Sequence, residues 1–316
     1  MLQEFADWLT YSALGMAQGS QQAAAVNFFV YDSIKVTLML AVIVFAVGIV
    51  RTFITPQKVK KLLGGRREGV GNAFAALLGV PTPFCSCSAV PLFIGFVESG
   101  VPLGITFSFL IASPLINEIA ATMLFAMFGW QIAAMYIGSG LVIAIVAGIA
   151  IGRMGLEGEV EEFVYKIKAK GIAEKNMAWR ERVDFGINES KDITFKVLPY
   201  LLVGIGIGGL IHGYAPSDML ASIAGRGNPL AVPIAVLVGI PLYSNAAGMV
   251  PIAGVLISKG MAVGTALAFM MSVIGLSLPE MIILRKVLKP KLLAIFAAIL
   301  FASFVATGYV FNLLIR

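Results

Sequence analysis

The chain has few charged residues, one histidine and two cysteines, and each scarcity excludes a class of protein. Charged residues make up 13% of its 316 residues and hydrophobic residues 59%. Soluble domains carry about 25% charged residues, so this composition excludes one. The mean hydropathy of +0.93 indicates an integral membrane protein. One histidine and two cysteines cannot close a four-ligand zinc site.

Several functional motifs are also missing from the sequence. There is no Walker A lysine loop and no H-E-x-x-H, so neither ATP hydrolysis nor metalloprotease chemistry is indicated. Glu4 and Asp7 occupy the N-terminal positions at which a cleavable signal peptide would have basic residues. We expect no cofactor, no resident metal and no nucleic-acid partner. The expected partners are the lipid bilayer and a small-molecule solute, and the sequence is compatible with a homo-oligomer.

The apolar segments predict an all-α polytopic membrane protein. Segments of about 20 residues or more can cross a bilayer, and eight such hydrophobic segments occur, two of them interrupted by prolines. Three of the other segments are 34–53, 131–151 and 193–211. We divide the chain into four parts: an N-terminal interfacial segment (1–29), repeat one (30–152), a charged cytoplasmic connector (153–191) and repeat two (192–316).

A proline-rich stretch from Pro81 to Pro91 interrupts the second hydrophobic segment. Prolines at this density deny a helix its backbone hydrogen bonds. Non-helical backbone at membrane depth is tolerated only where protein covers it or where it lines a cavity. We therefore predict a broken hairpin over 69–98 and a second one over 229–258. The residues expected to shape the two hairpins are Pro81, Pro83, Pro91, Pro241 and Pro251.

The second hairpin follows from an internal duplication. A constant shift in residue number superposes the segment 32–109 on 192–269 without a gap. The shift aligns many Gly and Pro residues, among them Gly79 on Gly239, Pro81 on Pro241, Pro91 on Pro251, Gly100 on Gly260 and Gly104 on Gly264. Glycines and prolines shared along so long a stretch indicate two related halves.

The distribution of basic residues predicts the orientation of the halves. Of 23 Lys and Arg residues, 18 lie in the segments 51–67, 153–191 and 285–291. The positive-inside rule places all three segments in the cytoplasm. That placement requires the 69–98 segment to enter and leave on one side, so an odd number of crossings separates the halves. We therefore predict two inverted repeats, each with three full spans and one broken hairpin, or 8–10 hydrophobic helices in total.

Cys85 and Cys87 are the first candidates for substrate binding. Thiolates prefer soft centres such as Cu(I) or trivalent arsenic. Two sulfurs one residue apart can hold one such centre if the backbone is extended, whereas in a helix they point about 200° apart. The alternative is that both cysteines are small apolar fillers in a tight turn.

Neighbouring polar residues complete the candidate substrate site. Thr82, Ser86 and Ser88 supply hydroxyls, which could instead satisfy backbone groups that the prolines leave unpaired. The second hairpin offers Ser244 and Asn245 but no thiol. Further along the chain, Ser113 and Asn117 are four residues apart on one expected helix face.

Glu118 and Glu280 are candidates for proton coupling. Both lie in otherwise apolar segments, and acids inside a membrane are functional candidates because ionised carboxylates are costly there. The alternative is that each lies near a span end. In that case Glu280 could pair with Arg285 five residues later.

The run Pro81-Thr-Pro-Phe-Cys-Ser-Cys-Ser-Ala-Val-Pro and its continuation Ser113-Pro-Leu-Ile-Asn-Glu118 resemble the predicted permease family that includes the ArsP organoarsenical efflux permeases. The resemblance implies inner-membrane permeation, with export of trivalent organoarsenicals such as methylarsenite in characterised members. Many relatives with this signature are simply called permeases, so the substrate does not transfer with the fold. The family is described with eight spans, which here requires each broken segment to cross once.

Three other functions stay open. The first is a permease for a different small solute, with both cysteines structural. The second is a membrane thiol oxidoreductase, although a Cys-x-Cys disulfide is strained and the chain has no second cysteine pair. The third is a passive channel, although a channel would not need carboxylates buried in the membrane. We expect a transporter and not an enzyme, with no catalytic residues.

Overall fold

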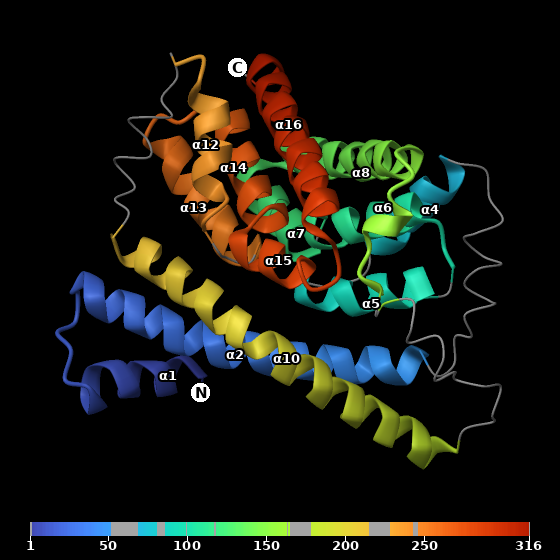
Figure 1. Ribbon diagram of the computed structural model, residues 1–316. Coiled ribbons are helices and arrows are strands. Elements are labelled where there is room, and N and C mark those ends of the chain that lie inside the picture. The colour runs from blue at the N-terminus through green and yellow to red at the C-terminus, as the bar shows by residue number, and fades with distance from the viewer. Residues whose placement is uncertain are drawn as a thin grey trace.

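The protein is helical throughout the residues that the structure describes (Figure 1). The computed structural model describes residues 2–51, 69–80, 86–98, 100–116, 118–162, 164, 178–214, 228–242 and 246–315. Within these ranges no strand occurs, and the one β contact is an isolated bridge between Val160 and Leu288. The prediction of an all-α protein is confirmed.

The helices form two series of the same order and spacing. The first series is α2 (Gln21–Arg51), α4 (Val70–Gly79), α5 (Ser86–Glu98), α6 (Leu103–Leu115), α7 (Glu118–Phe128) and α8 (Trp130–Arg153). The second is α10 (Trp179–Tyr214), α12 (Ala231–Gly239), α13 (Ala246–Ser258), α14 (Val263–Gly275), α15 (Leu278–Leu284) and α16 (Pro290–Leu314). The starts of α5 and α6 correspond to those of α13 and α14 under the same shift that superposes Gly79 on Gly239.

Both series make the same turn after the third helix. After α5, the N–H groups of Gly100 and Val101 donate to the carbonyl oxygens of Val97 and Phe96 at 2.9 and 3.0 Å. The same two bonds form after α13, both at 3.0 Å. This Schellman pattern needs a left-handed residue after the helix. Gly100 and Gly260 provide it with φ values of 75° and 100°.

Helices α6 and α8 cross closely because glycines line their contact. An added Cβ on Gly104 would lie 2.5 Å from the carbonyl oxygen of Gly148, and one on Gly148 would collide with the side chain of Ser108. In the second series, Gly264 of α14 and Gly308 of α16 approach each other in the same way. Small residues allow such close helix approach in apolar surroundings.

The chain reverses direction between α4 and α5. Near the start of α4, Asn72 donates to the Gly104 carbonyl (3.0 Å) and to Ser108 (2.9 Å), both in the first half of α6. At the end of α4, an added Cβ on Gly79 would lie 3.0 Å from the backbone nitrogen of Ser113, near the end of α6. Helices α4 and α6 therefore run in the same direction. The 13 residues of α5, about 20 Å in length, must carry the chain back.

The second series contains the same reversal. Val232 near the start of α12 and Ala268 of α14 both lie against Gly308. At the other end of α12, an added Cβ on Gly239 would lie 2.9 Å from Ser272 of α14. Helices α12 and α14 therefore run in the same direction, and α13 returns between them.

Helices α2 and α10 pack against each other in opposite directions, and Figure 1 shows them side by side in the lower part of the view, together with α1. Their contacts pair rising residue numbers on α10 with falling numbers on α2: Gly186 with Phe45, Ser190 with Ala41, and Gly206 with Phe29. These two helices hold corresponding places in the two series. The end of α2 lies beside the start of α10.

The segment after α8 lies against the turn between α15 and α16. Arg285 forms an ion pair with Glu161 at 2.9 Å, and Lys291 lies 3.5 Å from Glu159. The backbone N–H of Lys289 also donates to the Glu159 carbonyl at 2.8 Å. Parts of the two basic segments 153–191 and 285–291 therefore lie together. The basic segment 51–67 lies outside the described residues apart from Arg51.

The N-terminal helix is attached to α2 by polar contacts. Helix α1 (Leu2–Asp7) continues as a π-helical turn over Trp8–Ala13. A carboxylate oxygen of Asp7 accepts hydrogen bonds from Gln3 (2.9 Å) and from Asn27 of α2 (2.8 Å). These bonds hold α1 along α2.

Helix lengths distinguish spans from shorter arms. Three helical segments in the described part of the chain are long and apolar enough to cross a membrane: α8, Val263–Leu284 and α16. A fourth is the pair Leu103–Leu115 and Ala120–Phe128, which is bent by 48° where a single span was predicted. The apolar segments Val70–Gly79 and Met249–Ser258 have ten residues each, about 15 Å and half a bilayer core.

Both long helices, α2 and α10, begin earlier than the hydropathy indicates. Helix α2 starts at Gln21 and α10 at Trp179, ahead of the expected spans 34–53 and 193–211. Hydropathy marks only the apolar part of a helix. The charged start of α10 contains Arg and Glu, which are good helix formers.

The glycine crossing generates the first prediction. Gly148→Ala should destabilise the fold by about 1–3 kcal/mol, because the added methyl has no room against Ser108. Gly138→Ala on the same helix is the matched control, since nothing lies within 4 Å of its added Cβ. The melting temperature of the purified protein in detergent measures both. Equal stability of the two variants would show that the crossing is not closely packed.

Candidate functional site

In the second half, the break between α12 and α13 lies beside the break between α14 and α15. The backbone N–H of Leu278, at the start of α15, donates to the carbonyl oxygen of Ile240, just after α12, at 2.8 Å. Ser277, which precedes α15, is 3% exposed. Buried backbone groups need partners, and here one break supplies a partner for the other. The chain therefore places the end of α12 and the start of α15 at one buried point.

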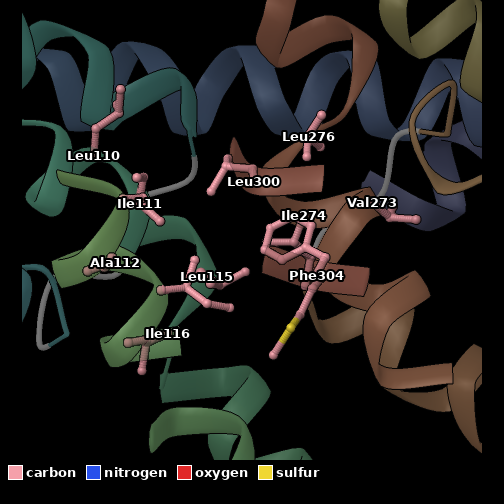
Figure 2. Close-up of a cluster of buried hydrophobic side chains, with 14 of the residues drawn as sticks. Leu110, Ile111, Ala112, Leu115, Ile116, Val273, Ile274, Leu276, Leu300 and Phe304 are labelled. Atoms are coloured by element: carbon pink, nitrogen blue, oxygen red, sulfur yellow. The ribbon is translucent and has the colours of Figure 1, made fainter. Parts of the chain in front are cut away.

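The ends of α6 and α14 meet at the centre of the molecule. An added Cβ on Gly275 would lie 3.2 Å from the Phe304 ring and 3.6 Å from Leu115. Figure 2 shows this cluster, in which Leu115 of α6 lies near Ile274 of α14 and Phe304 of α16. Leu115 and Gly275 are the last residues of α6 and α14, so corresponding ends of the two halves are in contact.

In the first half, the end of α4 packs against the end of α6, as the end of α12 packs against α14 in the second half. The end of α4, at Gly79, lies against Ala112 and Ser113 of α6. Ser113 is fully buried. The ends of α4, α6, α12 and α14 therefore converge on one buried region, where all four helices stop.

The second helix of each hairpin, α5 or α13, is called its returning arm, and it packs against the other half. Helix α5 contacts α15, and α13 contacts α7. At the second contact, an added Cβ on Gly254 would lie 2.9 Å from Met127 and 3.6 Å from Phe128. Glu280 belongs to α15 and Glu118 is the first residue of α7. Each returning arm thus touches the helix that carries the candidate acid of the opposite half.

Glu280 is buried, with 3% of its surface exposed. Arg285, the partner considered for it, forms its ion pair with Glu161 instead. Glu118 begins α7, and its side chain lies outside the described residues, as does all of Asn117.

The first turn of α5 includes Cys87. Because α5 begins at Ser86, the extended backbone that would let both sulfurs hold one soft centre does not continue past Ser86. The first turn of a helix has N–H groups without helical partners, and it favours negative charge. The side chains of Ser86–Ser88 lie outside the described residues, as do all of Pro81, Thr82, Pro83, Cys85, Ser244 and Asn245.

Three of the five hairpin prolines have described backbones. Pro241 directly follows Ile240 and is half-buried, as expected of a residue at the break. Pro91 and Pro251 lie inside α5 and α13, five residues beyond the helix starts. These two do not stand at the breaks.

Ser277 is a buried polar residue of this region that sequence reasoning missed. It is the N-cap of α15 and is followed by Leu278 and Pro279. A serine two residues before a proline and three before a glutamate is a typical helix start. That signal predicts the break between α14 and α15. Among the described residues, no group of His, Cys, Asp and Glu could hold a metal ion.

Comparison with known proteins identifies relatives along nearly the whole chain. Residues 21–313 match the model of the ArsP-type family, described as predicted permeases. UPF0718 protein MJ0584 of Methanocaldococcus jannaschii is 22% identical, over 91% of this chain and 95% of its own. UPF0718 protein YraQ of Escherichia coli is 23% identical, over 94% of this chain and 83% of its own.

A third relative is described as part of an assembly. A protein of Streptococcus mutans, named as a two-component membrane permease complex subunit, is 27% identical over 58% of this chain and 60% of its own. No solved structure matches the chain.

Proposed function

Since the chain belongs to the ArsP-type family of predicted permeases and is a multi-pass membrane permease, we propose that it is a proton-coupled exporter of thiophilic solutes such as trivalent organoarsenicals. It would act in the cytoplasmic (inner) membrane. The observation that carries the proposal is the convergence of four helix ends on one buried region between the halves. Secondary transporters bind substrate where broken helices of two repeats meet near the membrane midplane.

The thiols of the first hairpin set the proposed substrate class. Cys85 and Cys87 would exchange sulfur ligands with trivalent arsenic, a soft centre that prefers them to oxygen. Thr82, Ser86, Ser88, Ser113 and Asn117 would contribute polar contacts from the first half, and Ser244 and Asn245 from the second. Because the second half has no cysteine, the soft ligands would come from one side only.

Glu280 would couple release of the solute to proton entry, together with Glu118. Its burial supports this role, since acidic residues inside membrane-spanning segments commonly belong to proton pathways. The packing of α5 on α15 supports a site shared by both halves, with the thiol hairpin beside the helix of Glu280.

We further propose that the two halves are inverted repeats, 30–152 and 192–316. The opposed directions of α2 and α10 support this orientation. Their adjacent ends also require an even number of crossings between Arg51 and Trp179. The pair α6–α7 and the helix α8 supply two, so α4 and α5 would return to the side they entered from.

This arrangement gives six crossings and two hairpins in place of eight single spans. It places the basic segments 51–67, 153–191 and 285–291 on the cytoplasmic side. The contact between Glu161 and Arg285 supports a shared side for the last two. Residues 1–29 would lie at the membrane surface, where Phe5 and Trp8 of the N-terminal helix are 45% and 56% exposed.

Replacing both thiols tests the substrate class. The double variant Cys85→Ser, Cys87→Ser should lower methylarsenite uptake into everted vesicles by roughly tenfold or more, because hydroxyls bind trivalent arsenic poorly. Ser258→Ala, at the exposed end of α13, should transport normally. Normal transport by a correctly folded double variant would remove the thiols from the mechanism.

Neutralising the buried acid tests proton coupling. Glu280→Gln keeps the size of the side chain but cannot exchange a proton, so uptake should stop responding to an imposed pH gradient. Glu157→Gln, on the exposed segment after α8, is the control. Transport rates are measured across vesicle pH gradients of both signs, and an unchanged response in Glu280→Gln would assign the coupling elsewhere.

A further inference from the structure

Tyr136 of α8 carries a buried hydroxyl that makes no hydrogen bond within the described part of the chain. The side chain is 1% exposed. A buried tyrosine hydroxyl usually has a partner, because removing it from water without a replacement costs free energy. Phenylalanine would fill the same space without this cost. The packing of the helices therefore does not account for the hydroxyl.

Three other buried hydroxyls also have no hydrogen-bond partner among the described residues, those of Thr10, Ser33 and Thr194. A serine or threonine hydroxyl lies next to its own backbone and can turn toward the carbonyl oxygen one helical turn earlier. The tyrosine hydroxyl lies at the far end of its ring, away from the backbone of its own helix. Its partner has to come from the space beside α8.

The register of α8 against α6 places Tyr136 beside the break that follows α6. An added Cβ on Gly152 would lie 3.1 Å from the Cα of Gly104 in the first turn of α6. An added Cβ on Gly140 would lie 2.8 Å from Ile116, which directly follows the last residue of α6. Tyr136 lies one turn before Gly140 on the same face of α8, about 6 Å further along its axis. It therefore lies beyond the end of α6, beside the start of α7.

This break adjoins the region where the four helix ends converge. Leu115, the last residue of α6, would lie 3.5 Å from an added Cβ on Gly140 and 3.6 Å from one on Gly275. One side chain thus joins α8 to the contact between α6 and α14, and Figure 2 shows Leu115 and Ile116 in this cluster. Tyr136 is one helical turn away from it along α8.

Given the proposed export of trivalent arsenicals, we propose that the Tyr136 hydroxyl binds the solute by donating a hydrogen bond to an oxygen on arsenic. Methylarsenite in water carries one methyl group and two hydroxyls on arsenic. A cysteine thiol that replaces one hydroxyl forms a sulfur–arsenic bond and releases water, with no change in oxidation state. The other hydroxyl stays on arsenic. It is then a polar group in an apolar interior and needs a hydrogen-bond partner, as Tyr136 does.

The unpaired tyrosine hydroxyl also makes the site selective. A solute with an oxygen on arsenic satisfies both polar groups at once, whereas a solute without one leaves the tyrosine unpaired. The thiols therefore select for arsenic, and Tyr136 selects for arsenic that retains a hydroxyl.

Tyr136→Phe tests this role, because it removes only the hydroxyl. The variant should melt at the wild-type temperature or higher, since the lost group has no partner in the fold. In everted vesicles its KM for methylarsenite should rise about fivefold, which corresponds to one lost hydrogen bond. The matched control is Tyr309→Phe, since the Tyr309 hydroxyl donates to the Pro229 carbonyl near the end of α16. The control should transport with an unchanged KM.

Uptake by the wild type is measured in the same vesicles. Wild-type vesicles that take up no methylarsenite would contradict both the proposed export and the role of Tyr136. Normal uptake by the wild type with an unchanged KM in Tyr136→Phe would contradict the role of Tyr136 alone. A lower melting temperature of Tyr136→Phe would also overturn that role, because the hydroxyl would then have a partner inside the protein.

Discussion

Backbone groups that lose their helical partners in an apolar interior must find partners elsewhere, and this constraint orders the centre of the protein. Helix α12 stops at Gly239, and the next carbonyl, that of Ile240, accepts the N–H of Leu278 from a second break. One turn earlier, the Ser272 hydroxyl of α14 donates to the Val236 carbonyl at 2.6 Å. Two helix breaks whose backbone groups hydrogen-bond to each other have to be adjacent. The hydrogen bonds that stabilise the interior therefore also bring the residues of the candidate site together.

The two halves share their glycine crossings but differ in the polar residues beside them. Beside the first crossing, Asn72 of α4 donates a hydrogen bond to Ser108 of α6, whereas the second half has Val232 in place of Asn72. The second half instead joins α16 to α14 through Asn312 and Thr265 at 3.0 Å. The cysteines also differ between the halves, since only the first half has them. The two halves therefore share their helix packing but not the polar and thiol residues within it.

Composition and the Gly and Pro repeat were enough to predict an all-α membrane protein, because both report properties of the backbone and its surroundings. The constant offset between the repeats recurs in the structure, since α13 and α14 begin at the positions that correspond to the starts of α5 and α6. The start of α5 at Ser86 could not be predicted, because proline density marks a break but not the residue at which the next helix starts. The contact of α5 with α15 could not be predicted, since no local pattern specifies which distant helix a returning arm meets.

The proposed transport site depends most on the opposed orientation of the halves. Single cysteines introduced by Glu157→Cys and Lys259→Cys, each in a chain without Cys85 and Cys87, report it directly, because both positions are exposed. A membrane-impermeant maleimide should label the first only in inside-out vesicles and the second only in spheroplasts, since one crossing and one hairpin separate them. Labelling of both from the same side would mean that the hairpin crosses fully, and would contradict the inverted arrangement.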